Sequence, residues 1–223
     1  MEVKLDSDNP IIVPWRDTTD HRAALWTWCQ EWWGEREIVV ADDDQDGECF
    51  NHSRALNRAV ARCGSDVLVI VDADTVCDPL LLDQMVAMVR SNEVPWCVTT
   101  EYVQLTRSQT DVVLATGRLD WQGEPEWVGH GATCCGVVVV PRQAFDLVGG
   151  FGWGANDGAF RCAVDALWGN LFKVKGETVH LWHPRADPLH RYVDEQHAVI
   201  REYTAAAGDR EAMLELLARR TGE

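Results

Sequence analysis

The sequence has little positive charge and no long hydrophobic run. Its 20 Lys and Arg residues stand against 36 Asp and Glu residues, which gives a formal net charge of −16. This charge disfavours unassisted binding to a nucleic acid backbone, and an anionic substrate would need a metal ion beside it. No stretch approaches the ~20 apolar residues of a membrane span, and the N-terminus lacks the apolar segment of a secretory signal. We therefore expect a cytoplasmic protein.

Paired cysteine motifs, nucleotide-binding glycine loops, repeats and linkers are also missing. None of the 8 Cys residues has CxxC spacing, and Cys134 and Cys135 are adjacent, which suits neither a zinc knuckle nor an ordinary disulfide. We expect reduced, mostly buried thiols. The absence of Walker-type and GxGxxG loops makes ATP or dinucleotide chemistry a poor interpretation. Without repeats or a linker rich in Pro, Gly or Ser, the 223 residues are best interpreted as one domain.

The first ninety residues alternate between strand and helix patterns. β-branched or continuous apolar runs predict strands, and apolar residues at helical spacing predict the segments between them. The expected strands are 11–13, 37–41 and 67–71, and the expected helices are 19–33, 50–63 and one that begins near Pro79. This order favours an α/β fold with an open, mostly parallel sheet flanked by helices, whose ligands lie beyond the carboxyl ends of the strands.

The second half of the chain has a less regular pattern. We expect strands at 96–101, 136–140 and 172–182, a helix that ends near Trp168, and helices from about Asp187 to the C-terminus. We divide the chain into a main domain, 1–185, and a C-terminal helical extension, 186–223, packed on the same domain.

Carboxylates follow the expected strands at the edge where ligands should bind. Asp42 and Asp43 come after the second strand, and Asp72-Ala73-Asp74 after the third. Two carboxylates separated by one residue can share Mg²⁺ or Mn²⁺, although the plainer interpretation is a pair of turn or capping aspartates.

Two histidines offer further metal ligands near the end of the last expected strand. His180 and His183 are three residues apart, and the proline that follows His183 favours extended backbone there. Imidazole beside carboxylate would favour Mn²⁺ over Ca²⁺. The alternative is that His180 packs in a strand and His183 lies on the surface.

A glycine-rich segment surrounds Trp153 and ends in Asp157. A Trp in such a segment suits stacking on a sugar ring, and the carboxylate that follows could accept a proton. The alternative interpretation is a mobile surface loop.

These motifs, in this order, resemble the GT-A glycosyltransferases over roughly residues 10–185. The likeness is greatest to the inverting branch that contains β-1,4-galactosyltransferases, chondroitin-type polymerases and polypeptide N-acetylgalactosaminyltransferases. The resemblance rests on Ile11 to Asp17, on Asn51, Arg54 and Asn57, on Asp72-Ala73-Asp74, on Cys135 to Phe145, and on Gly152-Trp153-Gly154-Ala155-Asn156-Asp157. It implies a single GT-A, Rossmann-like domain with C-terminal helices.

The resemblance also assigns roles to individual residues. It implies that the donor nucleotide contacts Pro14, Arg16, Asp17, Asp42, Asp43, Arg54, Asn57 and Asp72. The metal ligands would be Asp74, His183 and His180, the last of these at a position where galactosyltransferases have methionine. On the acceptor side it places Trp153, Gly154 and Asn156. The family usually has Glu at the position of Asn156. We add His130, from the segment 106–130, to the acceptor side. Asp157 keeps the catalytic carboxylate of the inverting members.

The implied reaction transfers a sugar from a nucleotide-diphosphate sugar to a hydroxyl group. Mn²⁺ or Mg²⁺ would neutralise the departing diphosphate, with Asp157 as the general base. UDP-linked galactose, glucose or their N-acetyl forms fit as donors, and a glycan, a glycoconjugate or a hydroxymethylated DNA base fits as acceptor. Such an enzyme could be virus-encoded and act in a host cytoplasm. A nucleotidyltransferase and a non-catalytic carbohydrate-binding protein are the alternatives.

Overall fold

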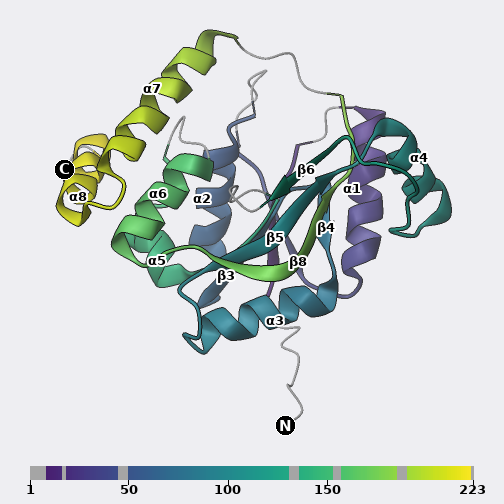
Figure 1. Ribbon diagram of the computed structural model, residues 1–223, viewed down its shortest axis with the longest axis horizontal. Helices are drawn as coiled ribbons and strands as arrows, with labels where there is room; N and C mark the ends of the chain where they lie inside the picture. Colours follow the sequence, from purple (N-terminus) through teal and green to yellow (C-terminus); the bar gives the residue numbers. More distant parts are fainter. Residues whose placement is uncertain are drawn as a thin grey trace.

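A computed structural model describes residues 9–16, 19–44, 50–130, 136–152, 157–184 and 190–221. Its strands form one mixed sheet in the order β2-β1-β3-β7-β5-β8-β4, with β6 paired to β5 outside this path. Helices cover both faces of the sheet (Figure 1). The expected α/β class is therefore confirmed.

The N-terminal part of the sheet is parallel, as the alternating pattern predicts. Its strands are β1 (Ile11–Pro14), β2 (Ile38–Ala41) and β3 (Val67–Val71). β1 lies between the other two and pairs in parallel with both. Every residue of β3 is buried, as expected for an apolar strand covered by helices on both faces.

The C-terminal part of the sheet is mostly antiparallel, which corrects the expectation of a mostly parallel sheet. Its strands are β4 (Thr75–Cys77), β5 (Cys97–Gln104), β6 (Trp127–His130), β7 (Val137–Pro141) and β8 (Phe172–His180). β7 runs antiparallel to both β3 and β5, and among the described strand pairs of this part only β5–β8 is parallel. The apolar run of β7 predicts burial on both faces, but such a run carries no information about strand direction.

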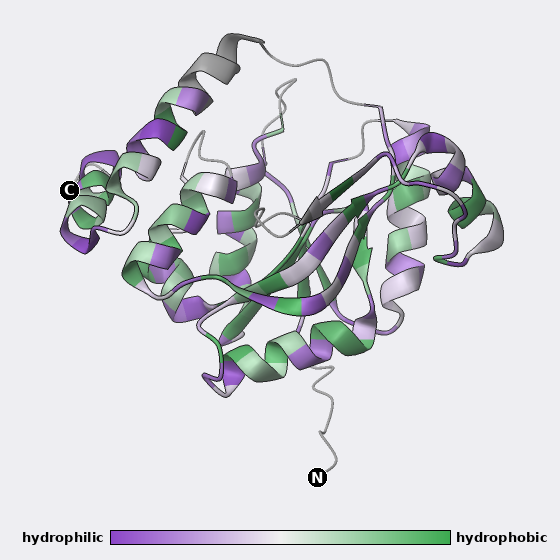
Figure 2. Ribbon diagram, viewed as in Figure 1, coloured by the Kyte–Doolittle hydropathy of each residue, from purple (hydrophilic) through white to green (hydrophobic). Residues whose placement is uncertain are grey.

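Two helical layers enclose the sheet. One layer contains α1 (Asp20–Trp33), α3 (Pro79–Arg90) and α4 (Arg107–Thr116), and the other contains α2 (His52–Arg62), α5 (Arg142–Leu147) and α6 (Asp157–Leu167). The caps follow the sequence: the Thr19 side chain accepts from the third residue of α1, and Pro79 opens α3 after the capping Asp78. The helices show mixed hydrophobic and hydrophilic colouring, which fits elements with one buried face (Figure 2).

The C-terminal helices extend the second layer. They are α7 (His190–Ala206) and α8 (Arg210–Thr221). Tyr203, Met213 and Leu216 are buried in the same core cluster as Phe160 of α6. The two helices therefore add to the core on the side of the sheet that α6 covers.

The described cysteines agree with the expectation of reduced thiols. Cys29, Cys77 and Cys97 are free and buried, while Cys63 and Cys162 are free and partly exposed. In the part of the chain that the structure describes, no helix is long and apolar enough to cross a membrane.

Candidate active site

The turn between β3 and β4 carries the Asp72-Ala73-Asp74 motif at the edge of the sheet. The backbone N–H of Asp72 donates to the Gly136 carbonyl at 2.9 Å, and the Thr75 N–H donates to the Asp72 carbonyl at 3.1 Å. These bonds fix a tight turn in which Asp72 is partly exposed and Asp74 is buried, with 6% of its surface exposed. The two carboxylates therefore have different surroundings.

Asp74, His180 and His183 form the group that can hold a metal ion. One ligand atom from each residue lies within 4.8 Å of the other two. The Nε2 atom of His180 lies 3.5 Å from Asp74 Oδ1, and the Nε2 atom of His183 lies 3.2 Å from Asp74 Oδ2. One carboxylate and two imidazoles form a donor set that suits Mn²⁺.

The surroundings of His180 also fit a metal ligand. Burial lowers its pKa, which the charge of Asp74 only partly offsets, so the ring is neutral near pH 7 and can bind a cation. Its Nδ1 atom is buried and has no hydrogen-bond partner among the described residues. The chemistry of this group therefore fits a divalent cation.

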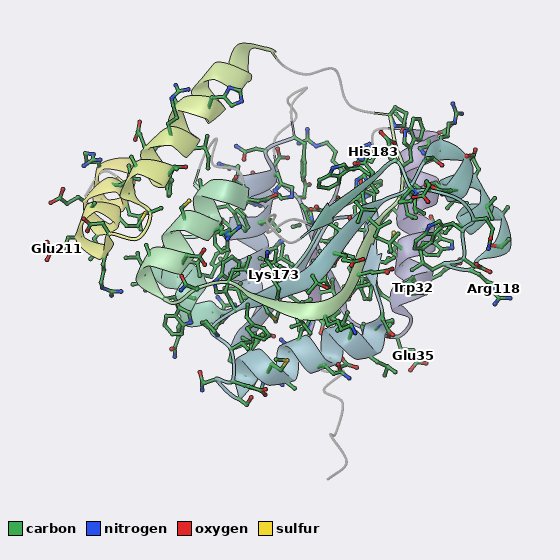
Figure 3. All side chains as sticks on the ribbon, viewed as in Figure 1. Trp32, Glu35, Arg118, Lys173, His183 and Glu211 are labelled. Atoms are coloured by element: carbon green, nitrogen blue, oxygen red, sulfur yellow. The ribbon has the colours of Figure 1, made fainter. Side chains whose placement is uncertain are left out.

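The backbone between the two histidines is held on both sides. The Leu181 N–H donates to the Asp74 carbonyl at 2.9 Å, and the Trp182 N–H donates to the Thr110 hydroxyl of α4 at 2.8 Å. His21 of α1 contacts the Trp182 carbonyl at 3.0 Å. Figure 3 labels His183 just beyond the end of β8, at the edge that α1 and α4 flank. The ligand segment is thus fixed by elements from three parts of the chain.

Arg22, which the sequence analysis did not single out, lies against this group. Its NH2 atom donates to Asp74 Oδ2 at 3.1 Å, and its NH1 atom lies 3.3 Å from His183 Nδ1. The residue belongs to the first turn of α1, directly after the loop that follows β1. The available signal in the sequence was an arginine in the first turn of the expected helix that follows β1.

A second titratable cluster joins Asp72, His52 and Asp157. His52, at the start of α2, has its Nε2 atom 3.5 Å from Asp72 Oδ1. The His52 ring makes edge contacts with Phe50 and Phe151. Although burial favours neutral His52, its hydrogen bond to Asp72 and the nearby carboxylates raise its pKa above the usual value. Burial likewise opposes ionisation of Asp72, but the His52 hydrogen bond and charge lower the pKa of Asp72. No motif in the sequence indicates this role for His52.

Asp157 begins α6 beside this cluster. Burial, followed by the charge of Asp72, raises its pKa to about 7, and the charge of His52 opposes that rise. A carboxyl group with this pKa can release and accept a proton near neutral pH.

Asn57 fixes the segment that leads toward Asp157. Its side-chain NH2 donates to the Phe151 carbonyl at 2.9 Å, and its Oδ1 atom accepts from the Phe151 N–H at 2.9 Å. Gly150 has φ +72°, and an added Cβ there would lie 2.5 Å from Asn57 Oδ1. The oxygen and the nitrogen of the Asn57 amide are therefore both hydrogen-bonded to the Phe151 backbone. Because Asn57 lies so close to residue 150, only glycine fits at that position.

The residues expected on the donor side are partly engaged with each other. Asp43 is fully buried, forms an ion pair with Arg16 and accepts from the Asn51 N–H at 2.7 Å. Arg54 donates to the Asp43 carbonyl at 2.9 Å and forms an exposed ion pair with the Asp44 carboxylate at 2.9 Å. Asp42 is exposed and Pro14 is buried at the end of β1. The structure thus brings Arg16, Asp43 and Arg54 together at the ends of β1 and β2.

Several predicted residues lie outside the described part of the chain. These are Asp17, Trp153, Gly154 and Asn156, together with the side chain of His130, whose backbone belongs to β6. Their assigned roles remain predictions.

Comparison with known protein families finds a match to one segment of the chain. Residues 47–113 match the family model described as Glycosyl transferase family 2. The matched segment contains α2, β3 and the Asp72-Ala73-Asp74 turn. This match supports a nucleotide-sugar-dependent glycosyltransferase. A search of curated proteins found no match.

Two similar solved structures support the same fold. One is described only as a mycobacterial protein, with 15% identity over 96% of this chain and 75% of that chain, and a TM-score of 0.50. The other is glucosyl-3-phosphoglycerate synthase from Mycobacterium tuberculosis in complex with Mn²⁺, uridine diphosphate and glucosyl-3-phosphoglycerate, with 14% identity over 96% of this chain and 80% of that chain, and a TM-score of 0.50. The chain thus has the fold of a GT-A glycosyltransferase, while its assignment to the galactosyltransferase-like branch stays a prediction.

Proposed function

We propose that this protein is a metal-dependent, inverting glycosyltransferase that moves a sugar from a UDP-sugar to an acceptor hydroxyl. One observation carries the proposal. The metal-ligating group around Asp74 and the neutral-pH carboxylate of Asp157 lie at the same edge of the sheet, joined by Asp72 and His52. A site for a leaving diphosphate and a site for proton removal are then adjacent.

The donor half of the proposal assigns Asp74, His180 and His183 to a divalent cation. Mn²⁺ bound there would neutralise the charge that develops on the departing diphosphate. Asp72, two residues before Asp74, would face the ribose or a water on the metal, with Arg16, Asp43 and Arg54 nearer the nucleobase. The choice of UDP and Mn²⁺ is supported by the similar mycobacterial synthase, which was solved in complex with both.

The acceptor half assigns proton removal to Asp157. Its raised pKa of about 7 makes it a stronger base than an ordinary aspartate while leaving a large ionised fraction at neutral pH. A base that deprotonates the acceptor hydroxyl allows that oxygen to attack the anomeric carbon opposite the diphosphate, so the anomeric configuration inverts. We assign Trp153, Gly154, Asn156 and His130 to the acceptor side.

Calorimetry with a panel of nucleotide sugars, each with Mn²⁺ and with EDTA, identifies the donor. The proposal expects metal-dependent binding of UDP and of one UDP-sugar. Proton NMR of the product formed with that donor and a panel of sugar acceptors then reports the anomeric configuration. A product that retains the donor's configuration would overturn the inverting mechanism, and the absence of nucleotide binding under every metal condition would overturn the transferase itself.

A further inference from the structure

The Arg22 guanidinium lies against Asp74, one of the three residues that could hold a metal ion. It donates to Asp74 Oδ2 at 3.1 Å, the same oxygen that lies 3.2 Å from His183 Nε2. The side chain of Asp74 is 8% exposed and that of Arg22 is 29% exposed, so the ion pair links a buried carboxylate to a more exposed guanidinium. A buried carboxylate thereby has a counter-charge supplied by the protein.

The His183 ring has two different partners for one nitrogen. Its Nδ1 atom lies 3.3 Å from Arg22 NH1 and 2.9 Å from the Pro184 carbonyl oxygen. Arginine only donates and a carbonyl only accepts, so the two contacts require opposite tautomers. When Nδ1 accepts from Arg22, the ring proton is on Nε2 and faces Asp74. When Nδ1–H donates to Pro184, Nε2 is bare and can bind a metal.

Arg22 and a divalent cation therefore compete for the Asp74 carboxylate and favour different tautomers of His183. A cation that shares Oδ2 with the guanidinium would meet like-charge repulsion at short range. A metal ion bound to Oδ2 would therefore displace Arg22 from Asp74, and the displaced guanidinium would need a new anion. The diphosphate of a donor bound beside the metal would be such an anion, and the planar arginine fork suits phosphate oxygens.

We propose that Arg22 is a donor-binding residue that neutralises Asp74 while the metal is absent and transfers to the donor diphosphate when the metal binds. The inference rests on the proposed function, because it takes the diphosphate of a nucleotide donor as the second partner of Arg22. Metal and nucleotide then bind cooperatively, since each favours the release of Arg22 from Asp74.

Calorimetric titrations of Mn²⁺ alone, of UDP with EDTA, and of UDP with Mn²⁺ measure this coupling directly. Relative to wild type, Arg22→Gln should bind Mn²⁺ alone about three- to tenfold more tightly, because the competing ion pair is gone. The factor by which Mn²⁺ tightens UDP binding should fall by about tenfold in the same variant, since the diphosphate loses a charged partner.

Two further variants keep the test decisive. Arg22→Lys retains the charge but not the fork, so its affinity for Mn²⁺ alone should stay near the wild-type value while the coupling falls between wild type and Arg22→Gln. Arg118→Gln removes one exposed charge just past α4, away from His183 in Figure 3, and should behave as wild type. Circular dichroism establishes that each variant is folded.

The outcomes separate this inference from the proposed function. Equal Mn²⁺ affinity and equal coupling in folded wild type and Arg22→Gln would overturn the role of Arg22 and leave the metal site intact. Weaker Mn²⁺ binding by Arg22→Gln would also overturn it, because Arg22 would then support the metal site rather than compete with the metal. No Mn²⁺ binding by any of the variants would instead contradict the proposed metal-dependent transferase.

Discussion

The surroundings of Asp74 and those of Asp157 act on a carboxylate in different ways. Asp74 is compensated by Arg22 at 3.1 Å and faces two imidazoles. Asp157 is close to a second carboxylate, Asp72, and burial together with that charge raises its pKa to about 7. The surroundings of Asp74 favour the binding of a cation to its carboxylate, whereas those of Asp157 favour the binding of a proton.

The difference shows how one sheet edge can supply both halves of a transfer reaction. His52 is the residue that joins the halves, because it bonds to Asp72 and its charge also acts on Asp157. Asp72 therefore serves both sides: its charge raises the proton affinity of Asp157, and its turn carries Asp74.

The largest effect is expected from Asp74→Ala. This substitution removes the carboxylate from the metal group and should abolish Mn²⁺-dependent UDP binding, with a loss of at least ~100-fold in metal affinity. Calorimetry of UDP with Mn²⁺ measures the loss. Asp111→Ala, at an exposed position of α4, is the matched control for a lost acidic charge. Unchanged metal affinity in Asp74→Ala would contradict the assignment of the metal site to the group around Asp74.

Asp157→Asn should separate catalysis from donor binding. The amide keeps the shape of the side chain but accepts no proton, so kcat should fall by ~10²–10⁴-fold. The affinity for UDP with Mn²⁺ should stay close to wild type because the metal group is untouched. A parallel loss of donor binding and turnover would indicate that Asp157 belongs to the donor site.

A smaller effect is expected on the pH dependence of turnover. Asp157 must be ionised to act as a base, so kcat/KM should fall as the pH drops below about 7. His52→Gln removes a charge that lowers the pKa of Asp157, so the acidic limb should move upward by about one pH unit. The rates of the two proteins should converge near pH 9, which a pH series of kcat/KM tests. A shift in the opposite direction would contradict the assigned role of His52.

The smallest expected effect is on stability. Between the ordinary pKa of an aspartate and about 7, the folded state holds a proton on Asp157 that the unfolded chain releases, so stability falls as the pH rises through this range. Asp157→Asn should therefore raise the Tm by roughly 2–5 °C at pH 8 and lose this advantage near pH 5. Thermal melts without metal at the two pH values measure the difference. An equal change at both would mean that charge is not the cause.

The sequence predicted the parts of the fold that depend on local pattern. β1, β3, α1 and α3 lie close to their expected bounds because their apolar spacing and caps are local signals. The sequence analysis gives no expected helix or strand in the segment 106–130, yet this segment contains α4 and β6. The capping box of Thr106 and Gln109 was a local signal for α4 that the sequence analysis did not use.

The sequence predicts the site residues whose own side chains can bind a metal ion. Asp74, His180 and His183 were chosen as metal ligands from their chemistry and from the resemblance, and the structure places them together. Arg22 was missed because its partners lie 52 and 161 positions away in the sequence. His52 was missed because its role comes from the carboxylates that meet it only after folding. The contacts of Arg22 and His52 form only in the folded protein, and the spacing of residues along the sequence does not predict them.

A crystal structure of the protein with Mn²⁺ and UDP tests the central claim most directly. The account predicts an anomalous manganese peak bounded by Asp74, His180 and His183, the diphosphate on that ion, and Asp157 facing the same cavity. It also predicts that Arg22 has left Asp74 and contacts a phosphate oxygen. Manganese and UDP bound away from these three ligands, or at a distance from Asp157, would contradict the account.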